Sequence, residues 1–318
     1  VDLIKNYFKI LLPISVGVFC IYFSFRNIDF SDFTQYFFEI NYTWVAVGII
    51  LGALSHISRS YRWKFLVNPL GYKLGFLNSV LAVFSAYLIN YTIPRAGDLA
   101  RATMISKYEK IPLEKTLGTI VAERAVDVIC IIVIICVGLI IEFQRISDKL
   151  ISLTQDAEIS VILIYFGALV LLLFILNRIL KKSKYYKSIT NFFSGIIEGL
   201  TVIFKMKKRN LFIFHSIFIW LMYILMFWAT SKAFVELHEV TFFQLMISFT
   251  LAALSIMFSN GGIGIYPLAV EESLGWYGIQ STTGLAFGWV SWLSQTMMVV
   301  IFGGLSLFVL PFINRNYK

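Results

Sequence analysis

Long runs of apolar residues, separated by short polar segments, dominate this chain. Six of the runs approach the roughly 20 residues that an α-helix needs to cross a bilayer; they cover residues 8–25, 43–58, 117–141, 159–177, 211–230 and 285–310. Two further apolar runs, 76–93 and 241–258, are interrupted by Asn, Ser or Gln and end in Pro or Gly turns. The pattern predicts an all-α polytopic membrane protein in which these two runs are either spans or hairpins that enter and return.

The composition excludes an ordinary soluble domain. Apolar residues make up 58% of the chain and charged residues 14%, and the mean hydropathy is +0.80. The three cysteines lie inside apolar runs and are odd in number, so they indicate no disulfide framework. The three histidines are far apart and lack the spacing of metal ligands. We therefore expect no metal site and no cofactor.

The distribution of Lys and Arg predicts the orientation. Basic residues cluster near the N-terminus, at 59–73, 95–115 and 178–209, and at the C-terminus. The loops 26–42, 142–158 and 231–240 hold few basic residues and several acidic ones. Under the positive-inside rule the basic clusters face the cytoplasm and these loops face outward. We therefore expect a multi-pass protein of the cell (inner) membrane with both termini in the cytoplasm.

The same rule decides between spans and hairpins. If the run at 76–93 crossed the membrane completely, the clusters at 95–115 and 178–209 would be translocated. A hairpin that enters and leaves on the cytoplasmic side keeps both clusters inside. By the same count, residues 241 to about 278 should enter and leave from the outside. The sequence thus predicts about six full spans plus two re-entrant helical hairpins.

This order of elements repeats along the chain. Residues 10–141 and 159–310 each read as span, span, hairpin and span, and the two halves start on opposite sides. Inverted-topology repeats of this kind are common in transporters. We expect one transmembrane domain, 1–318, with two repeat halves; the segment 142–210 supplies an external loop, a span and a cytoplasmic amphipathic connector. A coincidental arrangement of spans is the alternative.

Two arginines close the second span. Arg59 and Arg62 lie one turn apart on the same helix face, and arginine pairs bind phosphate bidentately. Ionisable side chains in or beside hydrocarbon cost roughly 2.5 to 3.5 kcal/mol each on insertion scales, so several together indicate a function. The alternative is an interfacial anchor formed by Arg62 and the following Trp63.

A second charged motif follows the first interrupted run. Asp98 is placed to cap the helix that follows the turn at residues 94–97. With Arg95 before this helix and Arg101 one turn into it, the segment outlines an anion site. The alternative is that Asp98 only caps the helix and pairs with Arg101.

A third motif lies inside the next apolar run. Glu123 and Asp127 are four residues apart and share a helix face, with Arg124 beside them. Glu123 lies roughly 9 Å inside the span at 1.5 Å per residue. We expect these acids to neutralise arginines of the hairpin or of the second span and to build a charged pocket open to the cytoplasm. A purely structural salt-bridge cluster is the alternative.

The second interrupted run ends in Ser259-Asn-Gly-Gly-Ile-Gly-Ile-Tyr-Pro267. Its glycines permit positive φ angles and close backbone approach. A break in a membrane helix also exposes backbone groups that can meet a polar ligand. A tight turn with no ligand fits this segment equally well.

Together these motifs resemble one family. R-x-x-R-W, N-x-x-x-P-R-x-G-D-x-x-R, E-R-x-x-D and N-G-G-x-G occur in the order found in the transmembrane family of lysylphosphatidylglycerol synthases, over nearly the whole chain. Asp98 stands where many relatives have Glu, and Asn260 replaces the commoner Pro. The resemblance implies a flippase-type protein that moves a lipid headgroup between leaflets. The soluble aminoacyl-transferring domain of the full-length enzymes would follow the last span, beyond Lys318, so we expect no synthase activity.

The leading interpretation is a transporter for an anionic or aminoacylated (glyco)phospholipid or a polyprenyl-phosphate. The candidate substrate-binding residues are Arg59, Arg62, Asn90, Arg95, Gly97, Asp98, Arg101, Glu123, Arg124, Asp127, Asn260, Gly261, Gly262 and Gly264. A membrane-embedded enzyme, with an acid of this set as its base, and a lipid-binding accessory subunit are the alternatives. The expected partners are membrane lipids and not nucleic acid; a homo-oligomer or a membrane-complex partner is left open.

Overall fold

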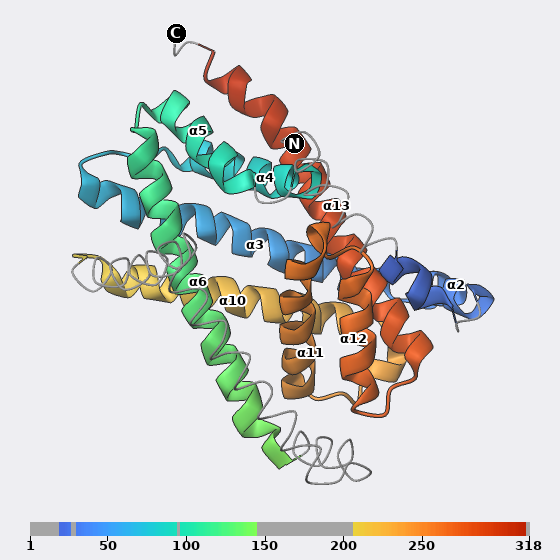
Figure 1. The fold of residues 1–318 in the computed structure, drawn as a ribbon. Coiled ribbons are helices and arrows are strands. Elements are labelled where there is room, and N and C mark those ends of the chain that lie inside the picture. The colour runs from blue at the N-terminus through green and yellow to red at the C-terminus, as the bar shows by residue number, and fades with distance from the viewer. Residues whose placement is uncertain (1–18, 27–29, 94–95, 145–205, 316–318) are drawn as a thin grey trace, which may run out of the picture.

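The structure is a computed structural model that describes residues 19–26, 30–93, 96–144 and 206–315. All of the regular elements in these ranges are helices (Figure 1). They are α2 (Phe30–Glu39), α3 (Tyr42–Val67), η1 (Asn68–Leu70), α4 (Phe76–Thr92), α5 (Gly97–Glu109), α6 (Leu113–Ile141), α10 (Arg209–Ser231), η2 (Val235–Leu237), α11 (Phe242–Ser255), η3 (Ile256–Phe258), η4 (Asn260–Gly262), α12 (Ile265–Gly275) and α13 (Ser281–Ile313). The predicted span at 159–177 and the amphipathic connector lie outside the described residues.

Helices α3 and α10 form the central pair of the molecule, side by side along most of their length (Figure 1). Near the start of α3, Gly48 leaves room for α10, since a Cβ atom there would lie 2.5 Å from Thr230 Oγ1. Near the end of α3, Arg62 donates a hydrogen bond of 2.8 Å to Ser216 in α10. The two helices are therefore antiparallel.

The first hairpin, α4 and α5, begins and ends at one end of the bundle. Asn78, at the start of α4, donates a hydrogen bond of 2.7 Å to Glu109 at the end of α5. Asn314, which follows α13, donates another of 2.8 Å to Asn78. Lys73 and Arg315 belong to the same region, and the start of α10 lies there with the end of α3. We call this the basic end.

The second hairpin, α11 and α12, begins and ends at the opposite end of the bundle. Tyr36 of α2 shares a hydrogen bond of 2.8 Å with Thr283 at the start of α13. The Asn41 amide donates to the Ala233 carbonyl at 3.2 Å, which joins the start of α3 to the end of α10. Glu39, Glu236 and Glu239 are found in this region, which we call the acidic end.

The tips of the two hairpins meet between these ends. Gly261, at the second tip, lies so close to Tyr91 of α4 that a Cβ atom would be 2.7 Å from its ring. Trp292 of α13 donates a hydrogen bond of 2.8 Å to the Gly261 carbonyl. The φ angles of Gly261, Gly262 and Gly264 are 63°, 81° and 74°. These three glycines therefore adopt positive φ angles, which the sequence permits.

The helices of the two halves have corresponding neighbours. In the first half, α3 packs against α4 and α6, α4 against α5, and α5 against α6. In the second half, α10 packs against α11 and α13, α11 against α12, and α12 against α13. Between the halves, α4 packs on α13 and α11 packs on α6. Each of these helix contacts in one half therefore has a counterpart in the other.

Several described helices are long and apolar enough to cross a membrane. In the described part of the chain, α6, α10 and α13 meet this condition singly, and the pair α2–α3, bent by 85°, meets it together. These helices coincide with the predicted spans at 43–58, 117–141, 211–230 and 285–310. Residues 19–25 of the first predicted span are helical. The total of six spans, the re-entrant hairpins and the inverted repeat stay predictions.

The segment 26–42 was predicted as an external loop, and it contains the helix α2 instead. Phe33, Tyr36 and Phe37 follow three-four spacing, which places them on one helix face, and they join the core at the acidic end. Asn41 then starts α3, since its side chain accepts a hydrogen bond of 3.0 Å from the Thr43 amide. Aromatic side chains packed against α13 thus stabilise a helix in a segment that lacks a long apolar run.

Candidate functional site

Helices α3, α5 and α6 bring five ionisable side chains together in the interior near the basic end. We call them the buried charge cluster; they are Arg59, Arg62, Arg101, Glu123 and Asp127, with exposed fractions of 2, 0, 1, 0 and 8%. Arg59 lies eight residues before the end of α3, which corresponds to roughly 12 Å of helix. Such burial is tolerated only when charges are paired and hydrogen-bonded.

Glu123 is the centre of this cluster. Its Oε1 accepts hydrogen bonds from Arg59 Nη1 at 2.8 Å and from Arg101 Nη1 at 3.1 Å. Its Oε2 accepts a third from Arg101 Nη2 at 3.0 Å. The pair with Arg101 is therefore bidentate, the geometry in which a guanidinium binds a carboxylate best. Through this one side chain α6 holds both α3 and the hairpin helix α5.

Asp127 lies one helical turn beyond Glu123 and binds both arginines of α3. Its Oδ2 is 2.5 Å from Arg59 Nη1, and its Oδ1 is 3.1 Å from Arg62 Nη2. The other Nη atom of Arg62 donates to Ser216 of α10, and its guanidinium lies 5.3 Å from the ring centre of Phe212. The second half of the chain therefore supplies one wall of the cluster.

Trp63 packs against Arg101 of the buried charge cluster and is itself held by a hydrogen bond to α6. The Arg101 guanidinium lies 3.6 Å from the centre of the Trp63 ring, a cation–π contact. Trp63 Nε1 donates a hydrogen bond of 2.9 Å to Thr119 Oγ1. Both Arg62 and Trp63 have an exposed fraction of 0%. The alternative of an interfacial Arg–Trp anchor is therefore wrong, because both side chains are used inside the helix bundle.

A sixth and a seventh charge, Asp98 and Arg124, form an outer pair next to the cluster. Arg124 Nε and Nη2 donate to the two Asp98 carboxylate oxygens at 3.0 and 2.7 Å, and Arg124 Nη1 lies 3.4 Å from Asp127 Oδ2. The side chains of Asp98 and Arg124 are each 37% exposed. This pair is thus the accessible part of the site.

The predicted N-cap role of Asp98 is wrong, and so is the alternative in which it pairs with Arg101. Ala96, and not Asp98, occupies the N-cap position of α5, and Asp98 lies in the first turn. Asp98 pairs with Arg124 of α6 and not with Arg101. The reason is that Arg101, one turn farther along α5, already lies on Glu123, whereas Asp98 faces the next residue of α6. An acid in the first turn still interacts favourably with the helix dipole.

Asn90 and Gly97 close the first hairpin. The Asn90 side-chain oxygen accepts a hydrogen bond of 2.7 Å from the Gly97 amide. A Cβ atom on Gly97 would lie 2.1 Å from the Ala86 carbonyl oxygen, so only glycine fits between α4 and α5. This contact explains both residues structurally; a role in substrate binding stays a prediction. Arg95 lies outside the described residues.

The glycine tip, made of Gly261, Gly262 and Gly264, lies apart from the buried charge cluster. Gly261 contacts Tyr91 and Trp292, and within the described ranges no hydrogen bond or ion pair joins it to the buried charge cluster. The residues grouped as one candidate site therefore occupy two places. The arginines of the cluster are buried against its carboxylates, and a charged pocket open to the cytoplasm stays a prediction.

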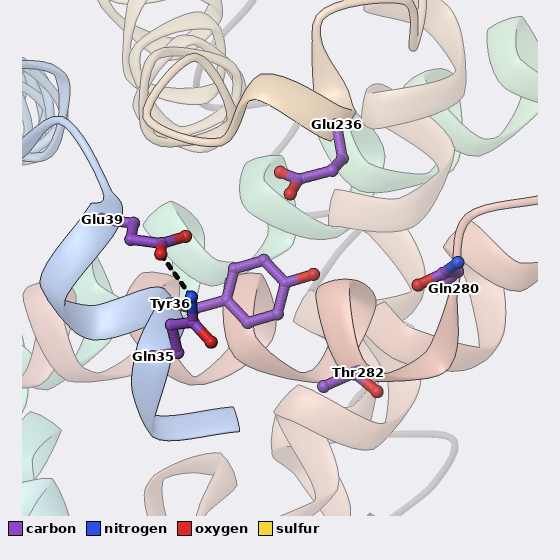
Figure 2. A pocket seen from close by; sticks show the side chains of 6 residues that line it. All are labelled: Gln35, Tyr36, Glu39, Glu236, Gln280 and Thr282. Carbon is purple, nitrogen blue, oxygen red and sulfur yellow. Dashed lines mark hydrogen bonds between the residues drawn. The ribbon is translucent and has the colours of Figure 1, made fainter. Parts of the chain in front are cut away.

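A separate cavity of about 230 Å³ lies at the acidic end (Figure 2). It opens between α2, the segment after α10 and the start of α13, and Figure 2 shows Gln35 donating to Glu39, at 2.5 Å. Its lining residues are Gln35, Tyr36, Glu39, Glu236, Gln280 and Thr282. These residues belong to none of the motifs described above. In the described ranges, no group of three or more His, Cys, Asp or Glu side chains is arranged to hold a metal ion.

All-helical architecture, apolar helices of spanning length and an ion-pair cluster among them define an integral membrane protein. The chain belongs to the family described as lysylphosphatidylglycerol synthase TM region, whose model matches residues 10–303. The predicted resemblance is thereby confirmed. The UPF0104 membrane protein MJ1595 of Methanocaldococcus jannaschii is 37% identical over 90 residues, which cover 27% of this chain and 27% of that protein. No solved structure matches the chain.

Proposed function

We propose that this protein binds the phosphate of a lipid headgroup at the buried charge cluster and its outer pair, and carries the headgroup between leaflets. The charge balance of the site supports this proposal. Among the described residues, four arginines face three carboxylates there, an excess of one positive charge. An uncompensated charge inside a membrane protein is costly. A lipid phosphodiester, with its single negative charge, neutralises the site.

Arg124 is the residue that first meets the phosphate in this proposal. It is the half-exposed arginine of the site, whereas the arginines of the cluster are buried. Its planar fork already holds one carboxylate in bidentate geometry, and phosphate oxygens fit the same fork. The lipid then displaces Asp98 from Arg124. Membership of a family named after a lipid-modifying enzyme also favours a lipid as the ligand.

The competing enzymatic function has weaker support. Each of the three acids that would act as the base accepts hydrogen bonds from at least one arginine. A carboxylate whose oxygens already accept hydrogen bonds from a guanidinium is not positioned to take a proton from a substrate. We therefore place these acids as counter-ions that keep the arginines in the membrane interior when no lipid is bound.

We further propose that the basic end faces the cytoplasm of a cell (inner) membrane, with both termini on that side, and that the two halves form an inverted repeat. Support comes from the separation of Lys73 and Arg315 from Glu39 and Glu236, and from the corresponding neighbours in the two halves. The two hairpins then enter from opposite sides, and their tips meet inside the membrane.

Single cysteines at Lys73 and Glu236, both exposed, test this orientation. In intact cells, a membrane-impermeant thiol reagent should label Glu236→Cys and leave Lys73→Cys unlabelled until the membrane is opened. A background in which the three native cysteines are replaced by Ala is the control. Labelling of both positions in intact cells, or of Lys73→Cys alone, contradicts the proposed orientation.

Reconstitution tests the transport function directly. Purified protein in liposomes should move labelled anionic, aminoacylated or polyprenyl-phosphate lipid between leaflets without forming a new chemical species. Conversion of the lipid indicates an enzyme instead. Binding without movement, restored by a partner from the same membrane, indicates an accessory subunit. Liposomes that neither bind nor move any of the three lipid classes contradict the proposal.

A further inference from the structure

Two side-chain amides join the start of α4 to the end of α13 at the basic end. Asn78 Nδ2 donates to Asn314 Oδ1 at 3.1 Å, and Asn314 Nδ2 donates to Asn78 Oδ1 at 2.8 Å. The second N–H of Asn78 donates to Glu109 of α5 at 2.7 Å, and the second N–H of Asn314 donates to the Leu310 carbonyl at 2.8 Å. All four amide hydrogens are therefore used. We call Asn78, Asn314 and Glu109 the amide lock.

One buried face of α13 continues from the amide lock into the helix bundle. Its members recur at three-four spacing and are Gly303, Ser306, Leu310 and Asn314. A Cβ atom on Gly303 would lie 2.8 Å from the Phe84 carbonyl oxygen of α4. Because the first and the last member of this face both meet α4, Ser306 between them faces α4 as well. The two helices are therefore in close contact from their middle to the basic end.

The corresponding contact between the halves, α6 with α11, is built differently. Gly138 of α6 faces α11, but a Cβ atom there would meet only side-chain atoms, of which the nearest is Ile247 Cγ1 at 3.1 Å. Within the described residues of α6 and α11, no hydrogen bond links the two helices. The contact of α4 with α13 is thus closed by hydrogen bonds and a close backbone approach, whereas its counterpart depends on apolar side chains.

A proline lies beside the amide lock. Pro311 is inside α13, three residues before Asn314. A proline has no N–H, so the Leu307 carbonyl one turn earlier receives no helical hydrogen bond from it. Helices bend most readily at such positions. The last turn of α13, which ends at Asn314, can therefore move away from α4 without unfolding the rest of the helix.

We propose that the contact of α4 with α13 is a gate at the basic end, which the amide lock holds closed in this structure. The gate opens to connect the buried charge cluster with the water at the basic end. This inference rests on the proposed function and adds how the site is reached. Two halves of an inverted repeat can exchange conformations. The unequal pair of corresponding contacts therefore indicates a second state, in which α4 leaves α13 and α11 closes on α6.

The chemistry of the lock fits a contact that opens and closes. Asn78 and Glu109 are only partly buried, so water replaces their hydrogen bonds when the helices separate. The net loss on opening is small for this reason. Ser306, which has an exposed fraction of 3%, becomes accessible to water only in the open state and can report on it.

Thiol labelling of Ser306→Cys tests the gate. The protein lacks its three native cysteines and is placed in nanodiscs, where both membrane faces are accessible. Adding Asn314→Ala should make a membrane-impermeant reagent react about ten-fold faster, because the loss of one or two hydrogen bonds shifts the equilibrium towards the open state by that factor. Asn78→Ala removes the same amide pair from the α4 side and should have the same effect.

A buried serine at the acidic end provides the matched control. Ser231, at the end of α10, has an exposed fraction of 0%. Ser231→Cys should react at the same rate with and without Asn314→Ala, since the gate does not include it. Faster labelling at both serines would show a general loosening of the fold and overturn the gate.

Cross-linking tests whether the gate must open for transport. Asn78→Cys with Asn314→Cys, joined by a short reducible bifunctional thiol reagent, should move lipid at least ten-fold more slowly than the same variant without the link, and reduction should restore the rate. Asn78→Cys with Glu109→Cys is the control, because it links α4 to α5 within one hairpin. Cross-linking should leave its transport rate unchanged.

The outcomes separate the gate from the proposed function. Equal labelling of Ser306→Cys with and without the amide pair overturns the gate. Transport that continues through a cross-linked Asn78–Asn314 pair also overturns it and leaves lipid transport intact. If the wild type moves no lipid, the proposed function fails, whereas the labelling rates still decide whether the contact of α4 with α13 opens.

Discussion

Replacing Glu123 with Ala is expected to destabilise the folded protein by about 3 to 5 kcal/mol, the usual cost of breaking a buried ion pair. Glu123 accepts three hydrogen bonds from Arg59 and Arg101, and its own exposed fraction is 0%. The variant leaves Arg101 with no carboxylate partner among the described residues and also separates α6 from α5. The melting temperature in detergent and the fraction of monodisperse protein measure this effect.

Two further variants make the test specific. Glu114→Ala removes an exposed acid from the first turn of the same helix and should change the free energy of unfolding by less than about 1 kcal/mol. The double variant Glu123→Leu with Arg101→Met removes both charges of the bidentate pair and should recover part of the lost stability. A Glu123→Ala protein that melts like the wild type contradicts the assigned role.

The pairing of Glu123 and Asp127 with arginines was predictable from the sequence. Four-residue spacing on a helix places the two acids on one face, and their apolar surroundings require partners of opposite charge. The structure confirms the prediction that these partners come from the second span and from the hairpin, in Arg59 and Arg101. Helical periodicity and the free-energy cost of an unpaired buried charge were sufficient to predict this pairing.

Other features depend on tertiary packing, which spacing does not reveal. The packing of α5 against α6 brings Asp98 to Arg124, and local sequence equally allowed Asp98 to cap its own helix. Ser216, the partner of Arg62, belongs to α10, far along the chain, and a lone polar residue in an apolar run does not indicate its partner. Helix α2 has aromatic residues at helical spacing, which indicates a helix. Because the segment lacks a long apolar run, it was predicted as a loop instead.

The orientation of the first hairpin was predictable from the sequence only in part. The positive-inside rule predicted that it begins and ends on one side, and Asn78 does contact Glu109 across its two ends. The geometry agrees with the rule because basic residues that cannot be translocated flank both α4 and α5. Its position relative to a bilayer stays a prediction that cysteine labelling tests.

Arg124→Gln and Asp98→Asn should change lipid binding in opposite directions. If the phosphate displaces Asp98 from Arg124, losing the guanidinium removes a charge-assisted bidentate contact of roughly 1.5 to 3 kcal/mol, about ten-fold or more in affinity. Losing Asp98 removes the competing anion, so binding should strengthen by up to about five-fold, the value of a half-exposed ion pair near 1 kcal/mol. Titration with dioctanoyl phosphatidylmethanol measures both.

Lys115→Gln is the matched control, because it removes one positive charge from an exposed position near the start of the same helix. It should change affinity by less than two-fold in about 0.15 M salt, where exposed charges are screened over about 8 Å. The melting temperatures of Arg124→Gln and Asp98→Asn should stay close to wild type, because a half-exposed pair contributes little to stability. If both variants weaken binding equally, the Asp98–Arg124 pair is a structural clamp and the phosphate enters by another route.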